Sequence, residues 1–215
     1  MDMNEKMLRA KQKLMQRGRG DSAREVDIDY GDPRVPPGQH LVNNWPVLDL
    51  GFKPELSLDD WTLTIDGQIE NPVTWNWEEF QAQPSKSYTT DFHCVTSWSR
   101  LDNEWVGVSF QHVCSIVRPL PSAQFLFFEA YDDYTTNLPL SVCQDDDVFL
   151  AVQWNHLPLS KDHGGPVRLI IPKLYAWKGA KWIKKITFTE QDQKGFWEIR
   201  GYSNTARPWQ NDRYG

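Results

Sequence analysis

Apolar and polar residues alternate along much of this chain, and the alternation predicts a series of short β-strands. Trp61, Leu63 and Ile65 alternate with threonines and stop at Asp66-Gly67, a pair typical of a turn. Further apolar runs predict strands at 124–131, 136–143, 148–154, 167–171 and 182–189. Prolines and glycines separate these runs, which favours short strands joined by turns and leaves Cys143 at a strand end without a partner.

Two segments have a helical pattern instead. Residues 76–84 predict a short helix that stops before Pro84, because the residue before a proline avoids helical backbone. Ser109 can cap a second helix, whose apolar residues recur at helical spacing: Phe110, Val113, Cys114 and Val117. Cys114 is therefore expected in the core. With few helices among many strands, we predict an α+β fold that is mostly β, with mixed and antiparallel sheets and short helices.

The N-terminal end differs in composition from the rest. The first twenty residues carry six Lys or Arg against two acids, whereas the remaining chain carries 17 basic and 27 acidic residues. Residues 17–40 are rich in Gly, Pro and charge, which is typical of a linker or an extended lead-in. We therefore expect 1–24 to be a basic tail, helical or disordered, and 25–215 to be a single domain. A helical tail would be either solvated or bound to a membrane surface or partner.

Composition excludes several classes of protein. A hydrophobic content of 40% and a charged content of 24% are those of a soluble globular protein. No apolar run approaches the ~18 residues of a membrane span, and no export signal is readable. The acidic body disfavours a nucleic-acid partner. The cysteines at 94, 114 and 143 form no CxxC pair and cannot all be bridged, which favours a reducing compartment, so we expect a cytoplasmic protein.

The stretch TTDFHCVTSWSR (89–100) holds an unusual cysteine. Cys94 ends a predicted strand beside His93 and among hydroxyl side chains, whereas an ordinary buried cysteine lies among aliphatic groups. Its surroundings favour a metal ligand or a nucleophile. A nucleophile would need a histidine, and four are available: His93, His112, His156 and His163. Zinc lacks paired ligand spacing here, and a cofactor-free β-rich binding module is a further alternative.

A second stretch, KDHGGPVRLIIPKLYAWKGAKWIKK (161–185), has seven Lys or Arg against one acid. Its two adjacent glycines let a backbone approach a ligand closely. Arg168 opens an apolar strand, and an arginine offers forked donors suited to a phosphate. With His163 and Lys181 beside it, Arg168 predicts an anion site, whereas Lys184 and Lys185 are better explained as solvated. A thiolate plus an anionic cofactor implies a metal that the cofactor brings.

The motifs DFHCVTSWS, EWVGVSF, LPLSKDHGGPVRLIIPKLYAWKGAKWI and GFWEIRGYSNTARPW, in this order, resemble the sulfite-oxidase-fold family of molybdopterin enzymes. The likeness runs from about residue 40 to 209 and is closest to the small cytoplasmic sulfite oxidase-like oxidoreductases. It implies a sulfite-oxidase-type fold, a molybdenum–molybdopterin cofactor, and two-electron oxygen-atom transfer on a small molecule. The joint occurrence of the cysteine motif and the His-Gly-x-Pro-Val-Arg motif is specific.

The resemblance implies roles for individual residues. The family's molybdenum ligand, and so the catalytic residue, falls on Cys94. Its phosphate-binding arginine falls on Arg168. The cofactor-binding residues implied are Asn43, Pro46, Val47, Cys94, His163, Arg168, Gly179, Ala180 and Lys181.

Two departures from the family pattern bear on the substrate. The periplasmic bacterial relatives have a threonine where this chain has Ala130, so one cofactor contact differs. Animal and plant sulfite oxidases have a sulfite-binding arginine where this chain has Ser99, followed by Arg100. We therefore expect a small S- or N-oxide rather than sulfite. The chain has no CxxCH haem motif or iron–sulfur cysteine set, so we expect a separate electron-transfer partner. We also expect a monomer.

Overall fold

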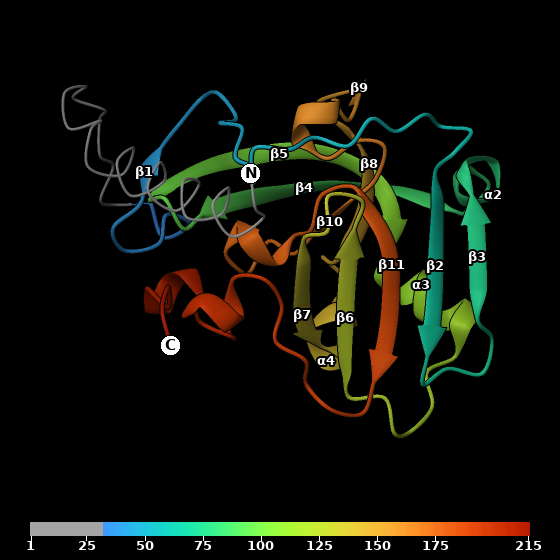
Figure 1. The fold of residues 1–215 in the computed structure, drawn as a ribbon. Helices are drawn as coiled ribbons and strands as arrows, with labels where there is room; N and C mark the ends of the chain where they lie inside the picture. Colours follow the sequence, from blue (N-terminus) through green and yellow to red (C-terminus); the bar gives the residue numbers. More distant parts are fainter. Residues whose placement is uncertain (1–31) are drawn as a thin grey trace.

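The computed structural model describes residues 32–215, which form two mixed sheets (Figure 1). The first follows the order β1-β5-β8-β10, with β4 on β5 and β9 on β8. Its strands are β1 (His40–Leu41), β4 (Ser85–Cys94), β5 (Trp98–Ser109), β8 (Phe149–Trp154), β9 (Leu157–Pro158) and β10 (Arg168–Ile170). The second sheet follows the order β3-β2-β11-β6-β7. Its strands are β2 (Thr62–Gly67), β3 (Val73–Asn76), β6 (Phe125–Ala130), β7 (Thr135–Pro139) and β11 (Ile183–Thr189).

The mostly β, mixed architecture confirms the predicted fold class. β1 pairs with β5 and β2 pairs with β11 in parallel, and the other strand pairs are antiparallel. The predicted N-terminal tail, 1–24, lies outside the described residues. No helix in the described part of the chain is long and apolar enough to cross a bilayer.

Both predicted helices form, each with the expected type of cap. In α2 (Trp77–Gln81), Asn76 and Glu79 make a reciprocal capping box. In α3 (Phe110–Val117), the Ser109 hydroxyl accepts the His112 backbone N–H at 3.2 Å. Cys114 lies at the margin of the core, half-buried, while three other members of that apolar face are fully buried: Phe110, Val113 and Val117.

The predicted strand at 136–143 is wrong in its second half. β7 ends at Pro139, and Leu140–Cys143 form a single helical turn, α4. Pro139 has no N–H to continue the ladder, and its φ of −58° suits the start of a helix. Four apolar or small residues are too few to show a helical period, so the run looked like a continuing strand. Cys143 is buried on this turn rather than at a strand end.

A buried ion pair connects three segments beside the second sheet. The Nζ of Lys178 lies 2.8 Å from Oε1 of Glu198, and both side chains are fully buried. Lys178 Nζ also donates to the backbone and side-chain oxygens of Asn137, each at 3.0 Å. The pair therefore ties β7 to the 3-10 turns η2 (Ala176–Lys178) and η3 (Glu198–Arg200).

We predict that Lys178→Met destabilises the fold by about 3–5 kcal/mol, because Glu198 keeps a buried charge without its partner. Denaturant unfolding of wild type and variant measures the difference. Lys184→Met is the matched control, since Lys184 is exposed, and its effect should stay within about 0.5 kcal/mol. A loss of stability below about 1 kcal/mol in Lys178→Met would contradict a stabilising role for the Lys178–Glu198 ion pair.

Candidate active site

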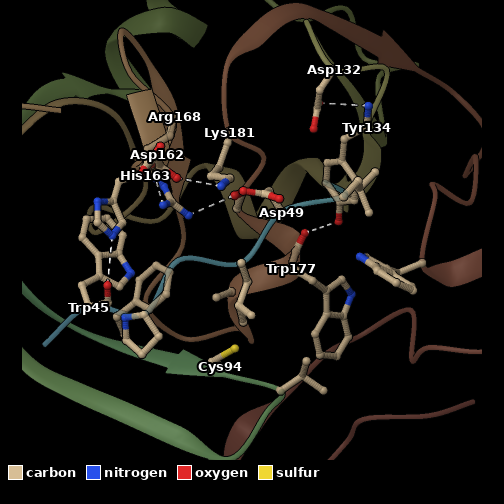
Figure 2. A pocket seen from close by; sticks show the side chains of 18 of the residues that line it. Trp45, Asp49, Cys94, Asp132, Tyr134, Asp162, His163, Arg168, Trp177 and Lys181 are labelled. Carbon is tan, nitrogen blue, oxygen red and sulfur yellow. Dashed lines mark hydrogen bonds between the residues drawn. The ribbon is translucent and has the colours of Figure 1, made fainter. Parts of the chain in front are cut away.

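A cavity opens between segments that lie far apart in the sequence. Its walls come from residues 45–50, 92–98, 132–134, 162–181 and 197–202. Figure 2 shows Cys94 on one wall, with Arg168, His163 and Lys181 across the cavity from it. The two sequence stretches that carried the chemical signals therefore meet at one site.

Cys94 reaches the cavity from the last position of β4. It pairs with Trp98, the first residue of β5, so the thiol sits at a tight turn. Its Sγ lies 3.1 Å from the Thr96 hydroxyl. Burial raises the pKa of the Cys94 thiol, and the hydrogen bond with Thr96 opposes that rise. Arg213 secures the same turn by donating to Val95 O and, at 2.7 Å, to the Ser97 hydroxyl.

Arg168 is a buried cation without a carboxylate partner among residues 32–215. Only 4% of it is exposed. Its Nη1 donates to His163 O at 2.9 Å and its Nη2 to Gly179 O at 3.3 Å, while Nε is buried without a partner. The guanidinium lies over the rings of Trp45 and Phe92, at 5.1 and 5.2 Å from their centroids. Burial lowers the pKa of Arg168 to about 9, so an anion beside it would be strongly favoured.

His163 organises the loop before Arg168. Its Nδ1 lies 2.9 Å from the Ser160 hydroxyl and its Nε2 lies 3.1 Å from Trp45 O. The ring stacks on Trp45 with centroids 4.0 Å apart. Both ring nitrogens are thus engaged, and burial lowers the pKa of His163. Its imidazole holds the Trp45 segment against the cavity.

The second cation at the cavity is Lys181. Its Nζ donates to Asp162 O at 2.8 Å. Burial, with the nearby Arg168 charge, lowers the pKa of Lys181 to about 8, so it can hold an anion below that pH. Gly164 has a φ of +102°, and a Cβ there would lie 2.8 Å from Lys181 Cβ. Glycine is required at this position both by the backbone and by the close approach of Lys181.

The structure brings together most, but not all, of the residues implied by the resemblance. Six line the cavity: Pro46, Cys94, His163, Arg168, Gly179 and Lys181. Val47 and Ala180 are not among its lining residues, and the Ala180 carbonyl accepts the Leu169 N–H at 2.9 Å. Asn43 is exposed outside the cavity, where its carbonyl accepts a hydrogen bond from Arg100 Nε at 3.3 Å.

Comparison with known proteins agrees with this geometry. Residues 50–197 match the family described as the oxidoreductase molybdopterin binding domain. The chain belongs to this family. It is an oxidoreductase of the sulfite-oxidase-fold, molybdopterin-binding class.

Relatives differ in how much of their length the chain spans. It is 38% identical to the uncharacterized oxidoreductase YuiH of Bacillus subtilis, over 84% of this chain and 92% of that protein. It is 28% identical to the protein-methionine-sulfoxide reductase catalytic subunit MsrP of Campylobacter jejuni, over 65% of this chain and 52% of that protein. The sulfane dehydrogenase SoxCD of Paracoccus pantotrophus shares the fold, with a TM-score of 0.59 at 23% identity, over 65% of this chain and 40% of that chain.

Several cavity residues were not anticipated as site residues. They are Tyr134, Trp177, Trp197 and Tyr202, together with Asp132. Tyr134 donates its hydroxyl to Trp177 O. Burial raises the pKa of Asp132 to about 6. Trp197 and Tyr202 belong to the motif GFWEIRGYSNTARPW, on which the family resemblance partly rests. Membership of that motif was the one feature of the sequence that could have indicated them as site residues.

The strand register explains why Ser99 and Arg100, the two positions considered for sulfite binding, do not line the cavity. Cys94, Trp98 and Phe92 line the cavity, whereas Ser99, opposite His93 in the ladder, is fully buried on the other face. Arg100 is not a cavity residue. Its Nη1 donates to Asn103 Oδ1 at 2.5 Å, and its guanidinium lies 4.7 Å from the centroid of the Trp154 ring. Neither residue brings positive charge to the space beside Cys94.

We predict that Arg168→Ala weakens retention of the phosphate-bearing pterin cofactor about 10- to 150-fold, because one charge-assisted contact is worth about 1.5–3 kcal/mol. Pterin content after gel filtration measures this in protein from a host that makes the cofactor. Lys184→Ala removes an exposed charge from the same basic stretch and should retain cofactor like wild type. Equal retention in Arg168→Ala would show that the phosphate lies elsewhere.

Proposed function

We propose that the chain binds molybdenum–molybdopterin and catalyses two-electron oxygen-atom transfer on a small S- or N-oxide. The observation that carries the proposal is the pairing, in one cavity, of the Cys94 thiol with a buried arginine that has no carboxylate partner among the described residues. An unpaired guanidinium is costly to bury, and a ligand with a soft metal at one end and a phosphate at the other would give the arginine an anion and the thiol a metal.

The residues present fit such a cofactor. The unpartnered Nε of Arg168 offers a donor to a phosphate oxygen, and Lys181 adds a second cation. The Cys94 thiol would lose its proton to become a metal ligand. When bound, molybdenum supplies the two-electron couple and the position that exchanges an oxygen atom with the substrate. Pro46, His163 and Gly179 would shape the walls around the pterin, and the roles of Asn43, Val47 and Ala180 remain predictions.

The chain's own contribution is orientation and proton supply. Reduction of an S-oxide consumes two electrons and two protons and releases water. The Asp132 carboxyl, with its pKa raised by burial to about 6, carries a proton for part of the time near neutral pH. It lines the cavity and so can supply that proton within it. Aromatic side chains, including Trp98, Trp177 and Trp197, line the cavity and would reduce the contact of a bound substrate with water.

An uncharged oxide suits this cavity better than sulfite. The space beside Cys94 is walled by Phe92, Trp98 and Val95, and the nearest expected cation, Arg100, is engaged elsewhere. Similarity to a methionine-sulfoxide reductase subunit supports an S-oxide. We further propose a cytoplasmic location, a monomer and a separate electron-transfer partner; the free cysteines Cys94, Cys114 and Cys143 support the first of these.

The alternative of a cysteine nucleophile has little support. Activation needs a histidine within hydrogen-bond reach of the thiol. His93 points to the other face of β4, where its Nδ1 lies 2.8 Å from the Ser99 hydroxyl. His163 is engaged with Ser160 and Trp45. The Cys94 thiol hydrogen-bonds to the Thr96 hydroxyl, which cannot serve as a general base.

We predict that Cys94→Ser abolishes oxygen-atom transfer, because a hard and poorly ionised hydroxyl replaces a soft thiolate. Elemental analysis for molybdenum, pterin release and turnover with an artificial electron dye measure the result. Cys114→Ser is the matched control and should keep both metal and activity. Full activity in Cys94→Ser would overturn the proposed function.

We predict that sulfite is a poor substrate. A doubly charged oxyanion needs fixed positive charge in the transition state, and one such contact is worth about 2–4 kcal/mol, or roughly 30- to 1,000-fold in rate. Molybdenum-loaded protein is assayed with sulfite and with a panel of S-oxides and N-oxides. Sulfite turnover that saturates at micromolar concentration and exceeds the whole panel would overturn the substrate assignment.

A further inference from the structure

A second hollow lies on the opposite face of β4 from the active-site cavity. It is lined by Thr89, Thr90, Asp91, His93, Asp147, Pro172, Lys173 and Trp209. Because successive side chains of a strand point to opposite faces, Cys94 lines the cavity while its neighbour His93 lines this hollow. We call it the rear groove. The function derived above does not use it.

The floor of the rear groove is a buried hydrogen-bond acceptor. His93 is only 1% exposed, and its Nδ1 lies 2.8 Å from the Ser99 hydroxyl. That hydroxyl lies 3.4 Å from Gln39 Oε1, and its donation to this oxygen is matched by the tautomer in which Nδ1 carries the ring proton. Nε2 is then left as an acceptor, and it is buried without a partner. Such a group calls for a donor from a ligand.

The surroundings of the groove are acidic. Asp91 and Asp147 line it, and Asp145 and Asp146 adjoin it in the sequence. Arg34 links Asp91, at 3.6 Å, to two further acids, Asp32 and Asp102. Two cations stand against these six acids: Arg34, and Lys173, which pairs with Asp145 and, at 3.1 Å, with Asp147. The surface therefore attracts positive charge.

An aromatic side chain forms one wall. Trp209 is 46% exposed and meets the His93 ring edge-on, with centroids 4.9 Å apart. Its Nε1 donates to Pro33 O at 3.2 Å, which fixes the indole. A fixed, half-exposed indole beside carboxylates suits a Lys or Arg side chain, which gains a cation–π contact as well as charge pairing.

We propose that the rear groove docks a basic one-electron carrier protein, one of whose Lys or Arg side chains enters against Asp91 and Asp147, over the His93 ring. This rests on the proposed function, in which Cys94 holds the metal. A carrier bound here lies behind the metal ligand, connected to it by one peptide unit and the His93–Trp209 contact. The substrate cavity on the other face of β4 stays open while the carrier is bound.

The electron count requires two encounters per turnover. Two reduced carriers, one S-oxide and two protons give two oxidised carriers, one sulfide and one water. Each carrier delivers one electron and leaves, so a weak, salt-sensitive and fast complex suits the task.

The first experiment measures binding without any turnover. Horse heart cytochrome c, a basic one-electron carrier, is titrated into the protein at low ionic strength by calorimetry. We expect binding that weakens with salt and is about tenfold weaker in Asp91→Asn/Asp147→Asn, because rim charges contribute a few tenths to about 1 kcal/mol each. Asp59→Asn/Glu190→Gln removes two exposed charges elsewhere and should bind like wild type.

Trp209 provides a variant that leaves the groove charges unchanged. Trp209→Ala should weaken binding about tenfold, and Trp209→Phe should restore most of it. Wild-type affinity in both Trp209→Ala and Asp91→Asn/Asp147→Asn would overturn the proposal. So would an equal loss in the control pair, or spermine binding as tightly as the cytochrome, since the groove would then recognise cations in general.

A second readout separates this proposal from the proposed function. On molybdenum-loaded protein, the groove variants should slow S-oxide reduction by a reduced basic cytochrome of low potential, such as cytochrome c3, about tenfold at subsaturating carrier, relative to reduction by a small dye. If neither donor supports turnover while the cytochrome still binds at the groove, the proposed function fails and the docking site stands. If dye-driven turnover is normal and the variants do not affect the cytochrome rate, the docking site fails alone.

Discussion

A buried guanidinium without a carboxylate partner in the described chain is the constraint around which the site is arranged. Arg168 opens β10 in the interior, where an isolated charge is costly. The fold reduces that cost with two carbonyls and two aromatic faces. These contacts fix the loop before Arg168, the Gly179 backbone and the Trp45 segment. What they leave uncompensated is net positive charge, which in the proposed function recognises the phosphate of the cofactor.

Local pattern was sufficient for much of the fold and for the chemical signals. Alternation located the strands, and Ser109 and Asn76 cap helices where the spacing of apolar residues predicted them. Two residues were unusual for their surroundings in the sequence: Cys94 lies among polar residues, and Arg168 begins an apolar strand. Such unusual residues can be recognised in a single sequence. Both parts of the site were therefore predicted from the sequence, whereas their proximity required the structure.

What local pattern missed is set by tertiary contact. Lys178 appeared as one lysine among many in a basic stretch, yet Glu198, twenty residues later, buries it completely. The Leu140–Cys143 turn is too short to show a helical period. Positions carried over by resemblance also depend on the path of the chain, and for two of them the role toward the cofactor stays a prediction. Asn43 and Ala180 match a motif in sequence, but the chain's path puts one in solvent and the other against β10.

Strand alternation also gives β4 two separate roles. One residue step moves a side chain from the cavity, where Cys94 lies, to the rear groove, where His93 lies. A reaction that exchanges an oxygen atom and two electrons needs a dry, enclosed space for the first and access to a large partner for the second. A single cavity serves both poorly, because a docked protein would block the substrate. In the proposed function, a metal ligand at the end of a strand with a hollow on each face removes the conflict, since the Cys94 side chain belongs to one face and its backbone neighbour to the other. The same alternation explains why Ser99, across the ladder from His93, contacts that ring rather than the cavity.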